Sequence, residues 1–306
     1  MILAVCADKG SPGVTTTATA LAAVWPDARV LLEADPSGGD LALRLRSQQD
    51  GELAVSPTVS SLAADAREGI PAGALARYAQ PTALGFPVLL GPPTAEAMEP
   101  MARLWPLVAD AATSWPGTVL TDLGRLQLRH AASPLAAAAA AVVLVTRAIA
   151  REDLYHLRER ASELAARLGQ GLHGRSPLVV VVVGPSAQAG SATDQVRQAL
   201  ASQAATSTIP VAGAIAMDRR AVEALRAMPS RRLFGSDLLR SARTVAETLI
   251  AWFPELVGRA DTADLSLLSD PSGGGSPTGA GRNRNPYLPR VTQHVQVPGS
   301  STRSHR

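Results

Sequence analysis

A short glycine-containing turn near the start of the chain carries residue types that suit phosphate binding. The turn follows an apolar run and reads Asp8-Lys9-Gly10-Ser11-Pro12-Gly13-Val14-Thr15-Thr16. Glycine tolerates the positive φ angles of a tight turn, and a helix that begins directly afterwards points free backbone N–H groups at an anion. Thr15 stands where a hydroxyl can reach a phosphate-bound Mg²⁺. The two glycines also suit an ordinary tight turn, so the turn alone leaves both interpretations open.

Two aspartates stand at the ends of later apolar runs. Asp35 follows the run Val30–Glu33 and precedes Pro36, and Asp122 ends the run Val119–Asp122. Ligands of open α/β sheets bind beyond the carboxyl ends of the strands, so both aspartates are candidate site residues. An Asp-Pro pair is also ordinary turn chemistry, and a lone aspartate at a strand end more often caps a helix or forms a turn.

Short apolar strands alternating with helices must position these residues. Continuous apolar runs are typical of strands buried on both faces of a parallel sheet. The runs are Ile2–Cys6, Val30–Glu33, Pro87–Leu90, Val119–Asp122, Val142–Thr146, Leu178–Val183 and Val211–Ile215. The helical patterns are Thr16–Trp25, Ala95–Ala112, Glu152–Leu168, Ala192–Gln203 and Ser236–Trp252. The alternation predicts an α/β fold with a doubly wound, mostly parallel sheet of about seven strands flanked by helices.

The composition changes near residue 257. Residues 258–306 are rich in Gly, Ser, Pro and Arg, which predicts a disordered tail after one folded domain at 1–257. From 271 to 306 there are five arginines and no acidic residue. The tail therefore has the charge to contact nucleic acid or an anionic membrane.

Two further features restrict the class of protein. No run approaches the roughly 18 apolar residues of a spanning helix, and the amino terminus lacks the basic start of a signal peptide. We therefore expect a cytoplasmic protein, with any membrane contact peripheral and at the cytoplasmic face. Cys6 is the only cysteine, which excludes an internal disulfide and a cysteine-based metal cluster; we expect it to be a buried apolar residue.

The turn at residues 8–16 resembles the K-G-G-x-G-K-T-T loop of the deviant Walker A ATPases. This MinD/ParA-type P-loop family of the SIMIBI class includes partitioning, septum-placement and pilus-positioning ATPases. Lys9, the only lysine in the chain, matches the signature lysine, which in the family reaches the partner subunit's nucleotide. The resemblance implies nucleotide contacts from Lys9, Gly10, Ser11, Pro12, Gly13, Val14, Thr15 and Thr16, with ATP and Mg²⁺ as ligands and a nucleotide-dependent homodimer.

The acidic segments match the same family. Residues 33–36 resemble its D-x-D-P switch, with Glu33 in place of the first aspartate, and residues 119–124 are similar to its Walker B segment. The resemblance implies catalytic roles for Lys9 and Asp35. It also implies that Mg²⁺ is held by Thr15, Asp35 and Asp122.

One position departs from the family pattern. Val14 replaces the lysine that holds the nucleotide phosphates in its own subunit. A charge-assisted hydrogen bond contributes about 1.5–3 kcal/mol, so we expect binding to be weakened roughly 10- to 100-fold. Hydrolysis should suffer more, because phosphoryl transfer depends on positioning and charge neutralisation. The loop is therefore predicted to bind a nucleotide and to turn it over weakly at most.

Two segments are similar to the TadZ/CpaE branch of the family, which positions Tad-type pilus or secretion machinery. Residues 39–45 resemble its F-G-D-x-A-x-x-L segment, and residues 86–96 resemble its strand and following turn. The family usually recognises adenine through an Asn-Arg pair after a late strand, whereas residues 184–186 here read Gly-Pro-Ser. That departure leaves the base specificity open.

Three functions remain open. The first is an ATP-switched dimer with slow turnover that positions a pilus, secretion, septum or similar assembly, and the second is a non-hydrolysing pseudo-ATPase scaffold. The third is a DNA-partitioning ATPase, in which arginines on one helix face would neutralise phosphates. These arginines are Arg219, Arg220, Arg226, Arg231, Arg232, Arg240 and Arg243. A solvated face in an arginine-rich sequence is the simpler explanation of them, and we favour it.

Overall fold

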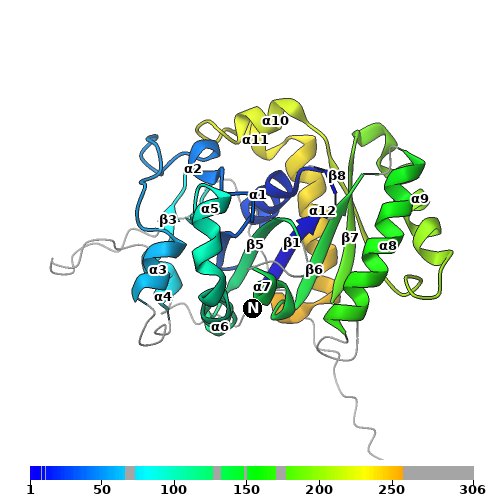
Figure 1. Cartoon of the computed structure of the whole chain (residues 1–306). Helices are drawn as coiled ribbons and strands as arrows, with labels where there is room; N and C mark the ends of the chain where they lie inside the picture. The colour runs from blue at the N-terminus through cyan, green and yellow to red at the C-terminus, as the bar shows by residue number, and fades with distance from the viewer. Residues whose placement is uncertain are drawn as a thin grey trace, which may run out of the picture.

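The fold is an eight-stranded sheet with helices on both faces (Figure 1). The computed structural model describes residues 1–7, 9–10, 12–65, 73–126, 132–147, 150–169 and 177–257. The strand order is β3-β4-β2-β5-β1-β6-β7-β8, and β3 alone among these strands runs antiparallel to its neighbour. The strands are β1 Ile2–Ala7, β2 Arg29–Glu33, β3 Gln80–Pro81, β4 Pro87–Leu89, β5 Thr118–Arg125, β6 Ala141–Thr146, β7 Leu178–Gly184 and β8 Val211–Ala216.

All seven predicted strands are present, and the predicted doubly wound, mostly parallel architecture is confirmed. The eighth strand, β3, has two residues and was not predicted. The α-helices are α1 Val14–Val24, α2 Leu41–Arg44, α3 Val59–Asp65, α4 Ala74–Tyr78, α5 Ala95–Met98, α6 Trp105–Ser114, α7 Ser133–Ala137, α8 Arg151–Leu168, α9 Ala189–Ala201, α10 Arg219–Ala224, α11 Arg231–Phe234 and α12 Asp237–Trp252.

One helix prediction was wrong in its extent. The stretch predicted as one helix from Ala95 to Ala112 is divided into α5, the 3-10 helix Glu99–Arg103 and α6. Proline lies at the start of the second and third pieces. Because proline lacks an N–H group and clashes with the preceding turn, it begins helices and interrupts them.

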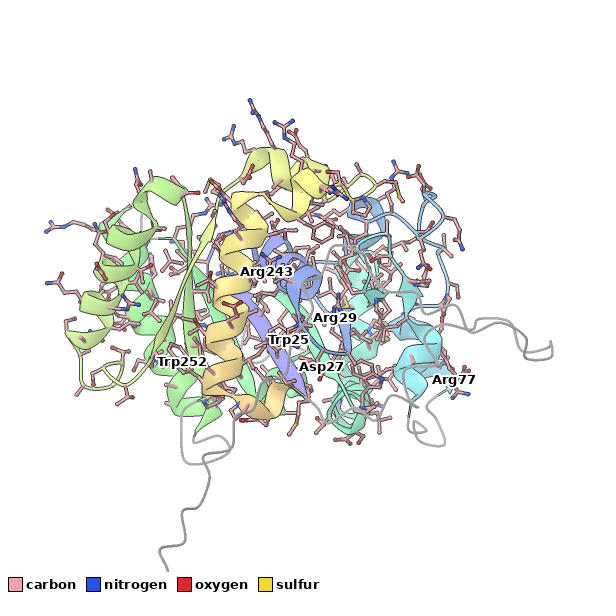
Figure 2. All side chains as sticks on the ribbon, turned by 180° about the vertical axis from the view of Figure 1, so that it is seen from behind. Trp25, Asp27, Arg29, Arg77, Arg243 and Trp252 are labelled. Atoms are coloured by element: carbon pink, nitrogen blue, oxygen red, sulfur yellow. The ribbon has the colours of Figure 1, made fainter. Side chains whose placement is uncertain are left out.

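Two apolar cores lie on opposite faces of the sheet. Side chains of β1 alternate between them, since Leu3 and Val5 join one core while Ile2, Ala4 and Cys6 join the other. Helices α1 and α12 cover the first face, and Figure 2 shows α12 lying along it from behind. Helices α6, α8 and α9 cover the second face. Burial on both sides explains why the strands read as continuous apolar runs.

The sheet brings the ends of β1, β2 and β5 together. β1 pairs with β5 and β6, and β2 pairs with the other edge of β5. All of these strands run in the same direction, so their carboxyl ends share one edge, over which α10 and α11 lie (Figure 1). None of the described helices is long and apolar enough to cross a membrane.

Candidate functional site

The two glycines of the turn after β1 have open space beside them. Gly10 has φ +70° and Gly13, the residue before α1, has φ +96°. A Cβ atom added at either glycine would meet no other atom within 4 Å. Gly13 provides no side-chain cap for α1, and the first turn of the helix has no acidic residue. The helix start therefore has no side-chain cap, and a free helix start favours an anion. Asp8 and Ser11 lie outside the described residues.

Val14 occupies the first position of α1 and is 5% exposed. Its side chain belongs to the apolar core between the sheet and α1 and α12. The position where the family carries a lysine therefore holds a packed aliphatic side chain and brings no charge to the turn.

Thr15 lies near Asp122. The Asp122 carboxylate accepts the Gly124 backbone N–H at 3.0 Å, and the Thr15 hydroxyl is near enough to lower the pKa of that carboxyl. The pKa of Asp122 is raised to about 6, mainly by burial and also by the nearby Asp35 carboxylate. The Thr15 hydroxyl, the Gly124 N–H and the Arg44 charge act in the opposite direction. Asp122 was predicted at a strand end, but β5 continues to Arg125, because Ala7 and Arg125 still pair.

Asp35 lies against the same strand. Its Oδ1 atom accepts the Ser37 N–H at 2.8 Å, which is the turn chemistry expected of an Asp-Pro segment. A Cβ atom added at Gly124, which has φ +51°, would lie 2.0 Å from Asp35 Oδ2. The structure thus brings Thr15, Asp35 and Asp122 together, and Gly124, which the sequence analysis missed, is the residue that leaves room for Asp35.

Glu33 holds the segment after β2 in place. Its carboxylate is 2% exposed and accepts the Leu41 N–H at 2.7 Å and the Gly91 N–H at 3.0 Å. A Cβ atom added at Gly39 would lie 2.2 Å from Glu33 Oε2. Burial raises the pKa of Glu33 to about 7, although its backbone hydrogen bonds act in the opposite direction. Glu33 therefore joins the two segments that carry the branch-level resemblance, a role that the sequence does not indicate.

Lys9 lies on the side of the turn that faces α8. Its Nζ atom is 3.3 Å from Nε2 of His156, a residue that the sequence analysis did not single out. Both residues line a cavity of about 270 Å³, together with Gly10, Pro12, Thr146 and Glu152. The Lys9 ammonium group must therefore give up its contact with His156 before it can contact another group.

A second, smaller cavity of about 20 Å³ lies at the other side of the turn. It is lined by Thr15, Thr16 and Thr19 of α1, by Arg44 and Leu45, and by Val222, Leu225 and Arg226. The Arg44 guanidinium forms an ion pair with Asp40, one helical turn earlier, at 2.7 Å.

The oxygen atoms of the site suit Mg²⁺ bound together with phosphate. Among the described residues, no group of three or more His, Cys, Asp or Glu side chains is arranged to hold a metal ion by itself. Mg²⁺ characteristically takes one or two carboxylates, with phosphate oxygens and water completing its shell. The Thr15 hydroxyl and the carboxylates of Asp35 and Asp122 are donors of this kind, next to an open helix start.

The arginines considered for DNA binding do not share one helix face, so that expectation was wrong. They are spread over α10, the segment after it, α11 and α12. Six of them are exposed, and Arg243, on α12 in Figure 2, is half-buried. These arginines are separated by the ends of helices. The Ser230 hydroxyl caps the start of α11, and the Ser236 hydroxyl caps the start of α12.

Neither a protein-family model nor a curated protein matches the sequence. Solved structures do match. A ParA-family ATPase from Chlorobium tepidum is 16% identical, with 83% of this chain and 99% of that chain covered and a TM-score of 0.57. The septum site-determining protein MinD from Pyrococcus horikoshii, solved with Mg-ADP, is 18% identical, with 80% and 94% covered and a TM-score of 0.59.

A third structure is the ATP complex of McdA from Cyanothece, in a variant with one aspartate replaced by alanine. It is 15% identical, with 82% of this chain and 96% of that chain covered and a TM-score of 0.56. At these identities the likeness concerns the fold. The chain therefore has the fold of the MinD, ParA and McdA ATPases.

Proposed function

We propose that the chain binds Mg-ATP at the turn between β1 and α1 and acts as a nucleotide-dependent dimeric switch or scaffold. The supporting observation is the meeting of Thr15, Asp35 and Asp122 beside an uncapped helix start. A hydroxyl and two carboxylates next to free N–H groups are the donors that a magnesium–phosphate group requires. The shared fold with an Mg-ADP complex of MinD and an ATP complex of McdA is in agreement.

Turnover is proposed to be weak. Val14 brings no cation to the turn, and Lys9 contacts His156 rather than the Asp122 group. Phosphoryl transfer needs its developing charge neutralised by positioned groups. The protein then acts mainly through the difference between its nucleotide-bound and free forms, positioning or regulating an assembly such as a Tad-type pilus or secretion system or a division septum, as the deviant Walker A resemblance implies.

The test is to titrate Mg-ATP and Mg-ADP into the full chain and to follow binding by calorimetry and dimerisation by analytical ultracentrifugation. We expect Mg-ATP to bind and to promote the dimer. Phosphate release should be slow and should disappear in Lys9→Ala, whereas Arg167→Ala, which removes an exposed cation on α8, should leave it unchanged. Binding without any phosphate release would favour the pseudo-ATPase scaffold, and absence of binding would refute the proposal.

A DNA-partitioning function is the second candidate. The exposed arginines of α10 and α11 lie over the same edge of the sheet as the turn, and they could meet phosphates from there (Figure 1). If they do, affinity for duplex DNA should fall steeply with salt, and the double variant Arg231→Gln, Arg232→Gln should lower the slope of log K against log salt by about two. A salt-independent or undetectable interaction would leave these residues as a solvated surface.

A further inference from the structure

The turn after β1 lacks a cation of its own at the position that normally faces a phosphate. Val14 is packed into the core, and Lys9 contacts His156 on the α8 side. Phosphates bound at the start of α1 would therefore need positive charge from another element. Arg44, the last residue of α2, is the cation that the geometry offers.

Arg44 lies beside the first turn of α1, the end of the helix that would face a phosphate. It lines the small cavity together with Thr15 and Thr16. Thr15 is itself one of the candidate magnesium ligands, so this cavity places Arg44 beside that group.

The backbone that carries Arg44 is fixed, while its side chain is easily released. The first residue of α2, Leu41, is fully buried and donates its N–H to the buried Glu33 carboxylate at 2.7 Å. The ion pair of Arg44 with Asp40 is partly exposed, at 33% and 59% for the two side chains. Such pairs contribute little to stability, so a phosphate can displace Asp40 at small cost.

We propose that Arg44 binds a phosphate of the bound nucleotide and supplies the positive charge that Val14 does not. The planar guanidinium matches two phosphate oxygens at once, which a lysine ammonium cannot do. Asp40 holds the side chain near the site when no nucleotide is present. This contact requires the nucleotide site proposed above and adds to it the residue that neutralises the phosphate.

The experiment compares Mg-ATP affinity, measured by calorimetry on the full chain, for Arg44→Gln and Arg46→Gln. Arg46 is a matched control two residues further on, because it is exposed and its Nε atom donates to the Arg226 carbonyl. We expect Arg44→Gln to weaken binding about 10- to 100-fold, as loss of a charge-assisted hydrogen bond would. Arg46→Gln should bind like the parent, and the thermal midpoints of both should show that they fold.

Two more variants examine whether Arg44 replaces the missing lysine. In Val14→Lys, the loss caused by Arg44→Gln should shrink to a few-fold, because a second cation then faces the phosphate; a double-mutant cycle measures this coupling. Asp40→Asn removes the competing carboxylate and should tighten binding by a few-fold. If the parent binds Mg-ATP and Arg44→Gln binds equally well, Arg44 has no such role although the nucleotide site stands. If the parent does not bind, both proposals fail.

Discussion

Glu33 is a buried carboxyl group whose protonation should affect stability. Its pKa is raised by burial to about 7 in the folded protein, against 4.5 for an ordinary glutamate. The fold therefore favours the protonated form, and this contribution is complete below about pH 4.5 and lost as the pH rises through 7. At about 1.4 kcal/mol per pH unit, the loss is on the order of 3 kcal/mol.

We therefore expect the free energy of unfolding to fall between pH 5 and pH 8, measured by urea denaturation without nucleotide. Glu33→Gln should flatten this dependence, leaving the smaller slope that comes from Asp122, whose pKa is also raised, to about 6. The variant should be less stable than the parent at pH 5, because the amide nitrogen cannot accept the second of the Leu41 and Gly91 N–H groups, whereas the hydroxyl oxygen of a protonated carboxyl can. An unchanged slope would show that Glu33 is ionised in the folded state throughout this range.

The lost lysine can be restored at Val14. A lysine at this position should tighten Mg-ATP binding by one or two decades, measured by calorimetry, because it adds a charge-assisted contact. Since Val14 is 5% exposed and packed in the core, the exchange should also destabilise the fold by about 1–2 kcal/mol. Val14→Met, of similar length and without charge, is the control and should not tighten binding. No gain with lysine would mean that the turn does not meet phosphate.

At the scale of elements, Gly124 is the contact point between β5 and the segment after β2. Gly124→Ala would place a Cβ atom 2.0 Å from Asp35 Oδ2 and would force a side chain into φ +51°. We expect a loss of about 2 kcal/mol or more in unfolding free energy, and nucleotide binding that no longer responds to Mg²⁺, because Asp35 is displaced.

The matched control is Gly190→Ala in α9. A Cβ atom there would meet no other atom within 4 Å. Gly190 is the second residue of α9, so alanine there should leave the free energy of unfolding unchanged or raise it slightly, and binding should be unchanged. Equal behaviour of the two variants would show that Asp35 does not depend on Gly124.

The elements that the sequence predicted correctly are those whose signal is local. Buried parallel strands read as unbroken apolar runs, so six of the seven were located to within one residue, and β5 extends three residues beyond its predicted end. β3 was missed because it has two residues, one of which is Pro81. The short helices α2 and α11 have four residues each, which is too few to display a helical period. The prolines between α5 and α6 were not recognised as helix interruptions.

Some residues of the candidate site could be predicted from the sequence and others could not. The closeness of Thr15, Asp35 and Asp122 follows from strands whose carboxyl ends share an edge, and the structure brings these residues together. Their roles in nucleotide binding stay predictions. Arg44 and His156 could not be found, because each meets the turn through packing between distant elements. Glu33 was noticed only as a substitution, since nothing local indicates that it accepts two N–H groups.

At the scale of the whole molecule, the end of the described chain contacts the starts of the central strands, on the side of the sheet away from the turn. The Trp25 indole N–H donates to the Thr118 hydroxyl at 2.9 Å, and that hydroxyl donates to the Leu256 carbonyl. Trp25, which is labelled in Figure 2, and Leu256 are both fully buried. The end of α1, the start of β5 and the segment after α12 are thereby linked, so the two cores close within residues 2–256.

This closure predicts where the chain can be shortened. Residues 258–306, the predicted tail, lie outside the described residues, and the division at 257 stays a prediction. A chain of residues 1–257 should unfold in urea with the same free energy as the full chain. Ending the chain at Trp252 should cost about 3–6 kcal/mol, because it removes the buried Phe253 and Leu256 side chains and the carbonyl that Thr118 contacts. If the 1–257 chain were destabilised as much as the 1–252 chain, residues beyond 257 would have to be part of the folded domain.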